Sequence, residues 1–481
     1  MARLSRGAAL LLAASAIAAL GACGKSEPPT KGFPPGAVPP ASPYEVLRGC
    51  PAPKGPVEEA PKGDGRIVVT GEPRQRMEGW GASVVTDTPV DPLVNPKGLS
   101  LRQVYDLDRR VFRDAGVNLI RVFGPGYGFY EVLAARPAQA RDPRLRFMQR
   151  VKRYGVRFMF TGAQAPAPFK AGKTLAAGRE DDYARYIAGY LRFARDVMKV
   201  PFDYAAIANE PDNRRSLLVL TPPQAAAVYR ALAGELRTQG LATKLVLGDT
   251  TGWGTACPYA DRLLRDDRVT RGAAAFASHS YFGTSAEARA VSELAAARDL
   301  PVWQTEFGTG CAECPDDDSM HGAIRWARQI VAALTKAQAT AWFAFRPVAD
   351  ATHGPGDALL VRDAKDPGRP YYASRRFEVF RQYSTAAPPG ARRLVVRDSL
   401  PETSAVAFGF RGRLSVVVTN ASRRPQVASL ELGTRRGTVS ARRTSATQRF
   451  APQPRRSYRG RTLRVALPPE SVTTYVLEPG R

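Results

Sequence analysis

The fold is constrained most by a regular alternation of short apolar runs and amphipathic stretches through the middle of the chain. Eight runs have the length and composition of buried strands, at residues 80–86, 118–123, 156–162, 204–210, 244–249, 275–281, 301–306 and 339–345. The stretches between them have the periodicity of helices, as at residues 181–198, 222–239, 286–298 and 321–336. Strands that alternate with helices indicate βα units around a parallel sheet. Eight such units predict an α/β fold with a closed (β/α)8 TIM barrel over residues 79–388.

A second pattern begins near residue 392 and predicts an antiparallel β-sandwich over residues 389–481. Short alternating runs separated by turn residues lie at 405–410, 414–419, 427–432, 463–467 and 472–477. An isolated strand at 66–70, ahead of the barrel, is expected to join this sandwich through a segment over 66–78. The second domain would then be held to the barrel by both ends of the chain.

The amino terminus resembles the signal of a bacterial lipoprotein. Two arginines precede an apolar segment at 8–20 that is too short to span a bilayer, and Leu20-Gly21-Ala22-Cys23 has the form of a lipobox. We expect a signal peptide over 1–22, lipidation of Cys23, and a tether rich in proline and glycine over 23–65. The chain would be exported and lipid-anchored to the bacterial envelope, at the outer membrane, facing the periplasm or the exterior. The alternative is an ordinary signal peptide that contains a cysteine.

Export places the remaining cysteines in an oxidising compartment. Cys50, Cys257, Cys311 and Cys314 form an even set with three possible connectivities, so we expect disulfides. Cys311 and Cys314 could instead hold zinc or act as a redox pair. The chain has no second CxxC motif, only 3 histidines and no thioredoxin-like context. We therefore predict no metal, and we expect these two cysteines to constrain the loop after strand 301–306.

No glycine-rich phosphate fingerprint follows the first strand, and we expect no cofactor.

The charge is strongly basic and concentrated near the carboxyl terminus. The formal net charge is +26, and residues 371–481 hold 21 arginines and no lysine against 6 acidic residues. One interpretation is attraction to an anionic partner such as an acidic polysaccharide or the envelope surface. The other is a basic surface that arises from biased composition, with Arg423-Arg424, Arg435-Arg436 and Arg442-Arg443 in turns. Little aromatic interleaving and export both disfavour nucleic acid as a partner.

Two of the expected strands end on a glutamate. The fourth ends in Ala208-Asn209-Glu210-Pro211 and the seventh in Gln304-Thr305-Glu306. A lone glutamate after a strand is more often a surface or capping residue. Catalytic residues of this kind of barrel, however, lie at the carboxyl ends of its strands. Two strands that end in this way therefore predict a paired-carboxylate site.

Several segments resemble, in order, the signature segments of glycoside hydrolase family 30. They are Gln75-Arg76-Met77-Glu78-Gly79-Trp80-Gly81-Ala82-Ser83, Ile207-Ala208-Asn209-Glu210-Pro211-Asp212, Ser278-His279-Ser280-Tyr281 and Val302-Trp303-Gln304-Thr305-Glu306. The segments at 371–377 and 389–392 are similar to the family's last barrel helix and its crossing into the sandwich. The resemblance covers residues 66–481. It implies a barrel with a β-sandwich that hydrolyses β-glycosides with retention of configuration.

The resemblance also implies roles for residues at the strand ends. Glu210 would be the acid/base and Glu306 the nucleophile, as two carboxyl groups about 5 to 5.5 Å apart serve in a retaining mechanism. Glu210 would then hold a proton near neutrality while Glu306 stays ionised. Arg121 and Tyr281 match positions that hydrogen-bond the nucleophile, although Arg121 could also be a structural ion-pair partner. Asn209 would bind the 2-hydroxyl of the sugar.

The same resemblance places three further side chains at the pocket, and two residues that depart from the family's pattern could also meet the sugar. Trp342 would form an apolar floor under the sugar and Trp80 would line the same pocket, unless both only pack the barrel. His279 would be an oriented pocket wall. Gln164 lies where many members have a tryptophan-rich segment, and it could replace stacking with a hydrogen bond. Arg346, after the eighth strand, could meet a carboxylated sugar.

The expected partner is a β-glycan or β-glycoside substrate, such as β-glucan, xylan or glucuronoxylan, and we expect a monomer. One alternative is a lipoprotein that binds glycan without cleaving it. Another is an envelope interaction protein in which the basic sandwich binds the partner. The presence of both Glu210 and Glu306 favours the hydrolase over these alternatives.

Overall fold

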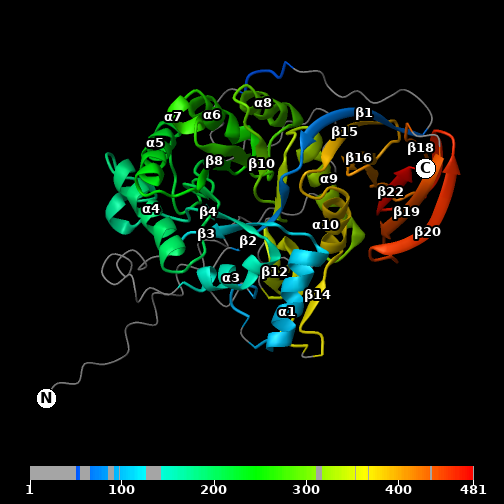
Figure 1. The fold of residues 1–481 in the computed structure, drawn as a ribbon, viewed down its shortest axis with the longest axis horizontal. Coiled ribbons are helices and arrows are strands. Elements are labelled where there is room, and N and C mark those ends of the chain that lie inside the picture. The colour runs from blue at the N-terminus through cyan, green and yellow to red at the C-terminus, as the bar shows by residue number, and fades with distance from the viewer. Residues whose placement is uncertain are drawn as a thin grey trace.

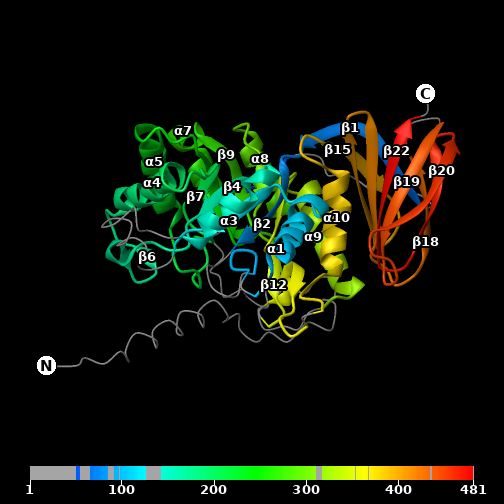
Figure 2. The same ribbon diagram turned by 60° about the horizontal axis from the view of Figure 1, so that its bottom comes forward.

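The computed structural model describes residues 50–54, 65–84, 92–96, 98–125, 142–309, 317–352, 354–366, 368–433 and 436–479. These residues form a barrel of strands and helices with a large second sheet beside it (Figure 1 and Figure 2). None of the described helices is long and apolar enough to cross a membrane.

A closed barrel of parallel strands forms the centre of the larger part, and it confirms the predicted TIM barrel. Its strands are β2 (Gly79–Val84), β3 (Leu119–Phe123), β4 (Arg157–Thr161), β7 (Tyr204–Ala206), β8 (Lys244–Thr250), β9 (Ala273–Ser278), β10 (Val302–Gln304) and β11 (Ala341–Ala344). Each strand overlaps one of the runs predicted from the sequence. The runs are visible in the sequence because strands of a parallel barrel are buried on both faces and so are continuously apolar.

Helices cover the barrel from outside (Figure 1). They are α1 (Leu101–Arg109), α3 (Pro143–Val151), α4 (Glu180–Asp196), α5 (Pro222–Thr238), α6 (Trp253–Leu264), α7 (Asp267–Thr270), α8 (Ser285–Ala296), α9 (Met320–Thr335) and α10 (Arg375–Ala386). Short π or 3-10 turns lie at Arg110–Asp114, Lys152–Tyr154, Ala167–Phe169 and Pro355–Asp357. Capping boxes on Ser100, Thr221 and Thr284 satisfy the first amides of α1, α5 and α8, and so determine where these helices begin.

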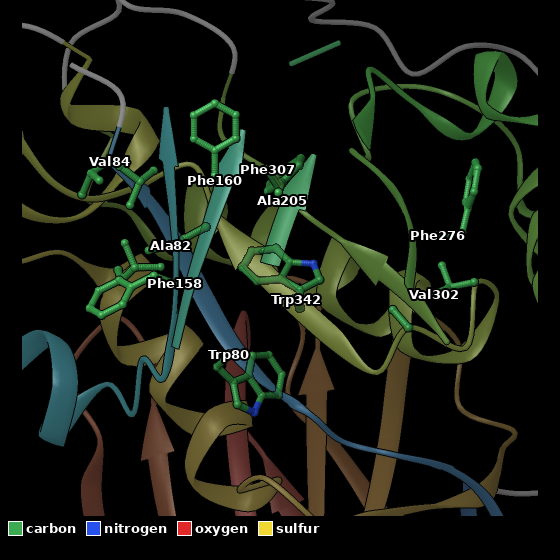
Figure 3. Close-up of a cluster of buried hydrophobic side chains, with 14 of the residues drawn as sticks. Trp80, Ala82, Val84, Phe158, Phe160, Ala205, Phe276, Val302, Phe307 and Trp342 are labelled. Atoms are coloured by element: carbon green, nitrogen blue, oxygen red, sulfur yellow. The ribbon is translucent and has the colours of Figure 1, made fainter. Parts of the chain in front are cut away.

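Side chains of the barrel strands alternate between the barrel interior and the layer under the helices. Phe343 points inward and belongs to the interior core. Trp80 and Trp342 belong to the outer layer (Figure 3). The ring centroids of Trp342 and Trp326 of α9 are 5.8 Å apart, and those of Trp80 and Phe380 of α10 are 5.5 Å apart. The prediction that Trp80 and Trp342 line the sugar pocket is therefore wrong, because both indoles pack on the helix side of the barrel wall.

A nine-stranded sheet forms the second part, in the order β20-β19-β22-β17-β16-β15-β1-β18-β21. Its strands are β1 (Arg66–Arg76), β15 (Arg392–Asp398), β16 (Thr403–Phe410), β17 (Arg413–Asn420), β18 (Gln426–Glu431), β19 (Arg436–Thr444), β20 (Ala451–Arg459), β21 (Thr462–Leu467) and β22 (Ser471–Pro479). β1 precedes the barrel in sequence but pairs with β15 and β18. The sheet encloses its own apolar core, which is separate from that of the barrel.

The apolar pattern misses three strands of this sheet, β15, β19 and β20. β20 contains Pro452, Pro454 and several arginines, and it lies at an edge of the sheet, where proline is tolerated. Most of β20 is exposed, so its sequence lacks the alternation of a half-buried strand. β19 carries Arg442 and Arg443, so the prediction that this arginine pair lies in a turn is wrong.

Polar contacts from α10 join the two parts of the molecule. Gln382 donates through Nε2 to Thr444 Oγ1 at 3.0 Å, and it accepts at Oε1 from the Thr474 hydroxyl at 2.6 Å. The hydroxyl of Tyr383 lies 2.7 Å from that of Thr419. These groups are buried, and a buried polar group without its partner is costly, so the contacts define how the sheet sits on the barrel.

Two small sheets complete the described strands. β5 (Lys170–Ala171) pairs with β6 (Thr174–Leu175). β13 (Ala358–Arg362) lies between β12 (Arg346–Asp350) and β14 (Tyr371–Ala373). β12 begins two residues after the last barrel strand, so Arg346 opens a sheet that the sequence pattern does not predict.

One disulfide joins Cys50 to Cys257 of α6, with the two Cα atoms 5.2 Å apart. The N–H of Lys54 also donates to a carboxylate oxygen of Glu293 in α8 at 2.8 Å. The segment 50–54 is therefore held against the barrel. Cys23, Cys311 and Cys314 lie outside the described residues, so lipidation and a second disulfide stay predictions.

Gly81 in β2 offers a test of the barrel packing. A Cβ atom at this position would collide with the buried ring of Phe343. We expect Gly81→Ala to lower the free energy of unfolding by about 1 to 3 kcal/mol, the usual effect of overpacking a core. Gly189→Ala in α4 is the matched control, because nothing lies within 4 Å of its Cβ position. Alanine there favours the helix by up to about 1 kcal/mol. Urea unfolding measures both variants, and equal stabilities would contradict this packing.

Candidate active site

Glu210 lies beyond the fourth barrel strand rather than in it. β7 ends at Ala206, and Glu210 follows in the left-handed region with a φ of 49°. This conformation is unfavourable for a residue with a Cβ atom. It is held by the Glu210 N–H, which donates to the carbonyl oxygen of Asp249 at 2.9 Å. The predicted strand over 204–210 is therefore too long, because a left-handed turn ends the strand before the glutamate.

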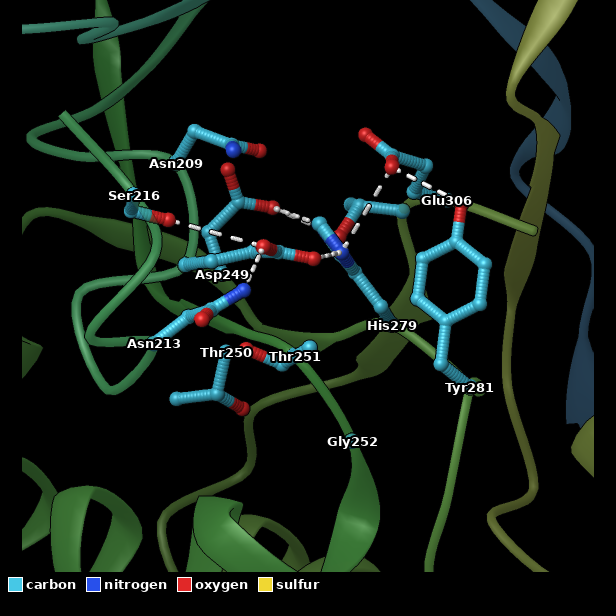
Figure 4. A network of polar contacts seen from close by, with 12 residues as sticks. Asn209, Asn213, Ser216, Asp249, Thr250, Thr251, Gly252, His279, Tyr281 and Glu306 are labelled. Atoms are coloured by element: carbon cyan, nitrogen blue, oxygen red, sulfur yellow. Dashed lines mark hydrogen bonds and ion pairs between the residues drawn. The ribbon is translucent and has the colours of Figure 1, made fainter. Parts of the chain in front are cut away.

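Glu306 lies two residues past the seventh strand, β10, and its side chain is almost fully buried. Its Oε2 accepts from Nη1 of Arg121 at 2.7 Å. Its Oε1 accepts from the hydroxyl of Tyr281 at 2.9 Å (Figure 4). Arg121 comes from β3, and Tyr281 follows β9. Both side chains that the sequence places on this carboxylate therefore donate to it.

The carboxyl groups of Glu210 and Glu306 lie close together, with His279 beside them. One oxygen of each carboxyl and one ring nitrogen of His279 all lie within 4.8 Å of one another. Nδ1 of His279 is 3.0 Å from Oε1 of Glu210 and 3.9 Å from Oε1 of Glu306. The imidazole is fully buried beside both carboxyl groups, and its role as an oriented wall of the pocket stays a prediction.

Asp249, in β8, is a site residue that the sequence patterns do not single out. It is fully buried, with a φ of 61°. Its Oδ1 accepts from the Thr305 hydroxyl at 2.6 Å and lies 3.5 Å from Nε2 of His279. Its Oδ2 accepts from the Thr161 hydroxyl at 2.7 Å and from Nη2 of Arg121 at 2.8 Å. A polar residue at the end of an apolar strand was the available signal, as it was for the glutamates.

The fully buried guanidinium of Arg121 connects these groups. Besides Glu306 and Asp249, it contacts Asn209, whose Oδ1 accepts from Nη2 at 2.5 Å. The carbonyl oxygen of Asn209 is therefore occupied. The Nδ2 group of Asn209 has no hydrogen-bond partner among the described residues, so it is the donor left for a ligand.

The loop after β7 supplies two further contacts that sequence reasoning missed. Oε2 of Glu210 accepts from Nδ2 of Asn213 at 2.7 Å and lies 3.5 Å from the hydroxyl oxygen of Ser216. Their only sequence signal is proximity to Glu210 in the chain. Together with His279, they place a donor on each oxygen of the Glu210 carboxyl.

Gln164 and Arg346 are the two remaining residues that the sequence analysis expects to contact the sugar. Gln164 follows β4 and is buried, and its Oε1 has no hydrogen-bond partner among the described residues. Arg346 opens β12, with its guanidinium 5.1 Å from the ring centroid of Phe345. The roles of Gln164 and Arg346 in binding a sugar stay predictions.

Residues 191–370, which include both glutamates, Asp249 and His279, match the family model described as Glycosyl hydrolase catalytic core. The chain contains a glycosyl hydrolase catalytic core. A search of the curated proteins finds no match to it. The chain is a glycosidase. Arg121 and Thr161, which both donate to Asp249, come from outside the matched segment.

The glycosidase shares its fold with enzymes of glycoside hydrolase family 30. It is similar to a GH30 endoxylanase from Clostridium papyrosolvens C71, with a TM-score of 0.70 and 16% identity over 86% of this chain and 100% of that chain. A GH30 xylanase C from Talaromyces cellulolyticus gives 0.70 and 20% over 86% and 99%. An endo-β1,6-glucanase gives 0.65 and 16% over 87% and 96%. The resemblance to the family is confirmed at the level of the fold.

The pKa shifts in the cluster differ from the sequence prediction, which expects Glu210 to hold a proton near neutrality. Burial works against a charged imidazole, yet the charge of Glu306, together with hydrogen bonding to Asp249 and Glu210, raises the pKa of His279 to about 10. Burial also acts on Glu210, but the hydrogen bond and charge of His279 prevail and lower the pKa of Glu210. Burial raises the pKa of Glu306, against the charges of His279 and Arg121. These shifts favour a proton on His279 over one on Glu210.

By spacing alone, Glu210, His279 and Glu306 could also hold a metal ion. Their charges are already matched by cations of the chain, since Arg121 donates to Glu306 and His279 contacts Glu210. A protonated imidazole has no lone pair for a metal. These residues fit a proton-transfer site better than a metal centre.

Asp212 is another carboxyl close to Glu210. It accepts the N–H of Thr251 at 3.0 Å and the hydroxyl of Thr255, and so links the segment after β7 to the start of α6. Burial raises the pKa of Asp212 to about 6, and the negative charge of Glu210 adds to the rise.

We expect Asp212→Asn to flatten the dependence of stability on pH. A carboxyl whose pKa is raised by folding binds its proton more tightly in the folded state, so stability falls as pH rises from about 4 to about 6. This contribution should be about 2 to 3 kcal/mol in the parent protein and absent from the variant. Urea unfolding at pH 4, 5, 6 and 7 measures it. Asp261→Asn, on the exposed side of α6, is the control and should keep the parent slope. Equal slopes in the two variants would refute the assignment.

Proposed function

We propose that this glycosidase cleaves β-linked glycans with retention of configuration, by double displacement at Glu306 and Glu210. The observation that supports this most is the approach of the two carboxyl groups, with oxygens within 4.8 Å of each other. Retaining enzymes place these groups about 5 to 5.5 Å apart, whereas inverting enzymes need about 6.5 to 9.5 Å to admit a water. The close pair favours direct attack by one carboxylate.

In the first step, a carboxylate oxygen of Glu306 attacks the anomeric carbon. The bond from that carbon to the leaving oxygen breaks, and Glu210 delivers a proton to the leaving oxygen. Arg121 and Tyr281 each donate to one oxygen of Glu306, which orients the nucleophile and stabilises its ionised form. A glycosyl ester of Glu306 results.

In the second step, water hydrolyses this ester. Glu210 takes a proton from the water, whose oxygen attacks the anomeric carbon, and Glu306 leaves as a carboxylate. The two inversions together retain the configuration. Asn209 supports both steps through its Nδ2 group, which we place on the 2-hydroxyl of the sugar, a contact that strengthens in an oxocarbenium-like transition state.

The proposed substrates are β-glucan, xylan or glucuronoxylan. Support comes from the shared fold with xylanases and with an endo-β1,6-glucanase. Gln164 replaces an aromatic wall with an amide whose oxygen lacks a partner among the described residues, and such an oxygen suits a sugar hydroxyl. Arg346 would add a contact for a carboxylated sugar.

We also propose that the enzyme is a monomer, exported and anchored by lipid at Cys23. The disulfide between Cys50 and Cys257 supports an oxidising compartment. The alternative of a lipoprotein that only binds glycan is not favoured, since two buried carboxyl groups with separate donors suit catalysis.

We expect Glu306→Ala to lose turnover of aryl β-glycosides and β-glycan oligomers by about 10³-fold or more, because no covalent intermediate can form. Azide should restore part of the activity by occupying the space of the carboxylate. A single displacement then gives the α-glycosyl azide, which proton NMR identifies. Glu235→Ala, near the carboxyl end of α5, is the control and should keep parent activity, because Glu235 makes none of the contacts of the cluster. Parent turnover in Glu306→Ala would disprove the assignment of the nucleophile.

Glu210→Ala should behave differently from Glu306→Ala. We expect about 10²- to 10⁴-fold loss on glycans, whose leaving oxygen needs a proton, and a much smaller loss of the first step on dinitrophenyl β-glycosides. Azide should then speed release of the glycosyl enzyme and give the β-glycosyl azide, because two displacements take place. The anomer of the azide separates the two roles. The same anomer from both variants would exclude this pair of roles.

A further inference from the structure

We propose that Asn213 is a positioning residue that holds Glu210 as a carboxylate, oriented to act as the base of the second step. This inference rests on the proposed role of Glu210 as the acid/base. It assigns control of the Glu210 charge to one amide in the loop after β7, a residue outside the segments that resemble family 30.

The orientation of the Asn213 amide follows from its two neighbours. Oδ1 lies 2.9 Å from the backbone nitrogen of Arg215, and Nδ2 lies 2.7 Å from Oε2 of Glu210. A backbone N–H can only donate, so the atom that faces Arg215 must be the amide oxygen. The atom that faces Glu210 is then the NH2 group, which also can only donate. Asn213 therefore cannot turn its amide around to accept a proton from Glu210.

The backbone of the loop holds Asn213 against Glu210. The N–H of Asn213 donates to the carbonyl oxygen of Glu210 at 3.0 Å, and the N–H of Ser216 donates to that of Asn213 at 2.9 Å. The N–H of Leu220 donates to the carbonyl oxygen of Pro211 at 3.0 Å and closes the loop. Asn213 is only 9% exposed, so little water competes for its amide. The donor on Oε2 is thus built into the loop that begins at Glu210.

A fixed amide donor favours the charged form of Glu210. An N–H stabilises a carboxylate more than a carboxylic acid. Burial works most strongly against ionisation of Glu210, and the negative charges of Glu306 and Asp212 also oppose it. The contact with His279, the hydrogen bond from the amide and the charge of Arg121 together prevail and lower the pKa of Glu210. The amide is therefore one of the groups that overcome burial.

The charged form is what the second step requires. In the glycosyl enzyme Glu306 is an ester, and Glu210 must accept a proton from water. A Glu210 that kept its proton after the first step could not do so. The amide helps Glu210 to give that proton to the leaving oxygen and to remain a base. Nδ2 donates in both steps and neither gains nor loses a proton, so the proton balance of the proposed mechanism is unchanged.

The first test is the pH dependence of the second step. Dinitrophenyl 2-deoxy-2-fluoro-β-glycosides load Glu306 and leave a glycosyl enzyme that hydrolyses slowly, so this step can be followed by itself. Its rate falls at low pH as Glu210 becomes protonated, and Glu306 no longer titrates. Asn213→Ala removes the donor and raises the pKa of Glu210, so the acid limb should move up by about 0.5 to 1 pH unit. An unmoved limb would overturn the proposal.

Asn213→Asp separates the donor from the shape of the loop. A carboxyl oxygen can still accept the N–H of Arg215, so the turn is kept, but a second carboxyl group then faces Oε2 of Glu210. Two carboxyl groups this close do not both ionise readily, so the limb should move up further than in Asn213→Ala. A limb like that of the parent would show that Asn213 only shapes the loop, against the proposal.

Arg215→Ala is the matched control for these variants. It keeps the backbone N–H that orients the amide of Asn213 and removes an exposed side chain from the same loop. Exposed charges contribute little, so its limb should stay at the pH of the parent. A shift as large as that of Asn213→Ala would contradict a specific role for the amide.

The second test needs no substrate. Urea unfolding of Asn213→Ala, Glu210→Gln and the double variant at pH 7 measures the coupling between the amide and the carboxylate. Asn213→Ala should lower the urea midpoint more in the parent than in the Glu210→Gln background, because the donor meets a charge only in the parent. Equal losses in the two backgrounds would refute the inference.

The two tests separate this inference from the proposed function. If the parent forms no glycosyl enzyme and hydrolyses no glycoside, the proposed function fails, while the unfolding cycle still decides whether Asn213 holds the Glu210 carboxylate. If the parent is active but the coupling is absent, the proposed function stands and the role of Asn213 is refuted.

Discussion

The site depends on one buried guanidinium. Arg121 is fully buried, where an unpaired charge would be unfavourable by several kcal/mol. Each of its nitrogens faces an acceptor. Nε and Nη2 both donate to Asp249, and Nη2 also donates to Asn209. Nη1 donates to Glu306 and lies 3.5 Å from the hydroxyl oxygen of Ser83. Removing this side chain would leave two buried carboxylates without their cation. The ends of four strands are therefore tied to one residue, and the positions of the nucleophile and of the sugar-binding amide are coupled through it.

Local backbone strain is found at the same place. Glu210 and Asp249 both have positive φ, at 49° and 61°, and the N–H of the first donates to the carbonyl oxygen of the second. Such conformations are unfavourable by about 1 to 3 kcal/mol each and persist only where the surroundings determine them. Here the surroundings are the bonds from Thr161 and Thr305 to Asp249 and from Asn213 to Glu210. The barrel thus supplies the stability that holds two carboxyl groups in geometries they would not otherwise adopt.

The sequence predicts the barrel and the two glutamates because both depend on local pattern. Apolar runs mark the strands, and a polar residue that ends such a run marks the rim. Asp249 has the same signal, but its partners come from three other strands, so its importance appears only in the assembled barrel. For Trp342 the sequence suggests a role in the pocket that the structure does not support. The strand pleat sends it outward when its neighbour Phe343 points inward, and this register is not evident from composition.

The charges of the cluster suit the charge that develops as a glycosidic bond breaks. With Glu306 ionised, as the proposed attack requires, the carboxylates of Asp249, Glu210 and Glu306 stand against Arg121 and the imidazolium of His279, and the cluster carries one net negative charge. An oxocarbenium-like transition state adds positive charge, so the total approaches zero as the reaction proceeds, which favours the transition state over the ground state. Moving the proton from His279 to Glu210 leaves the net charge unchanged. A proton can therefore reach Glu210 from His279 without placing a new net charge in a buried site.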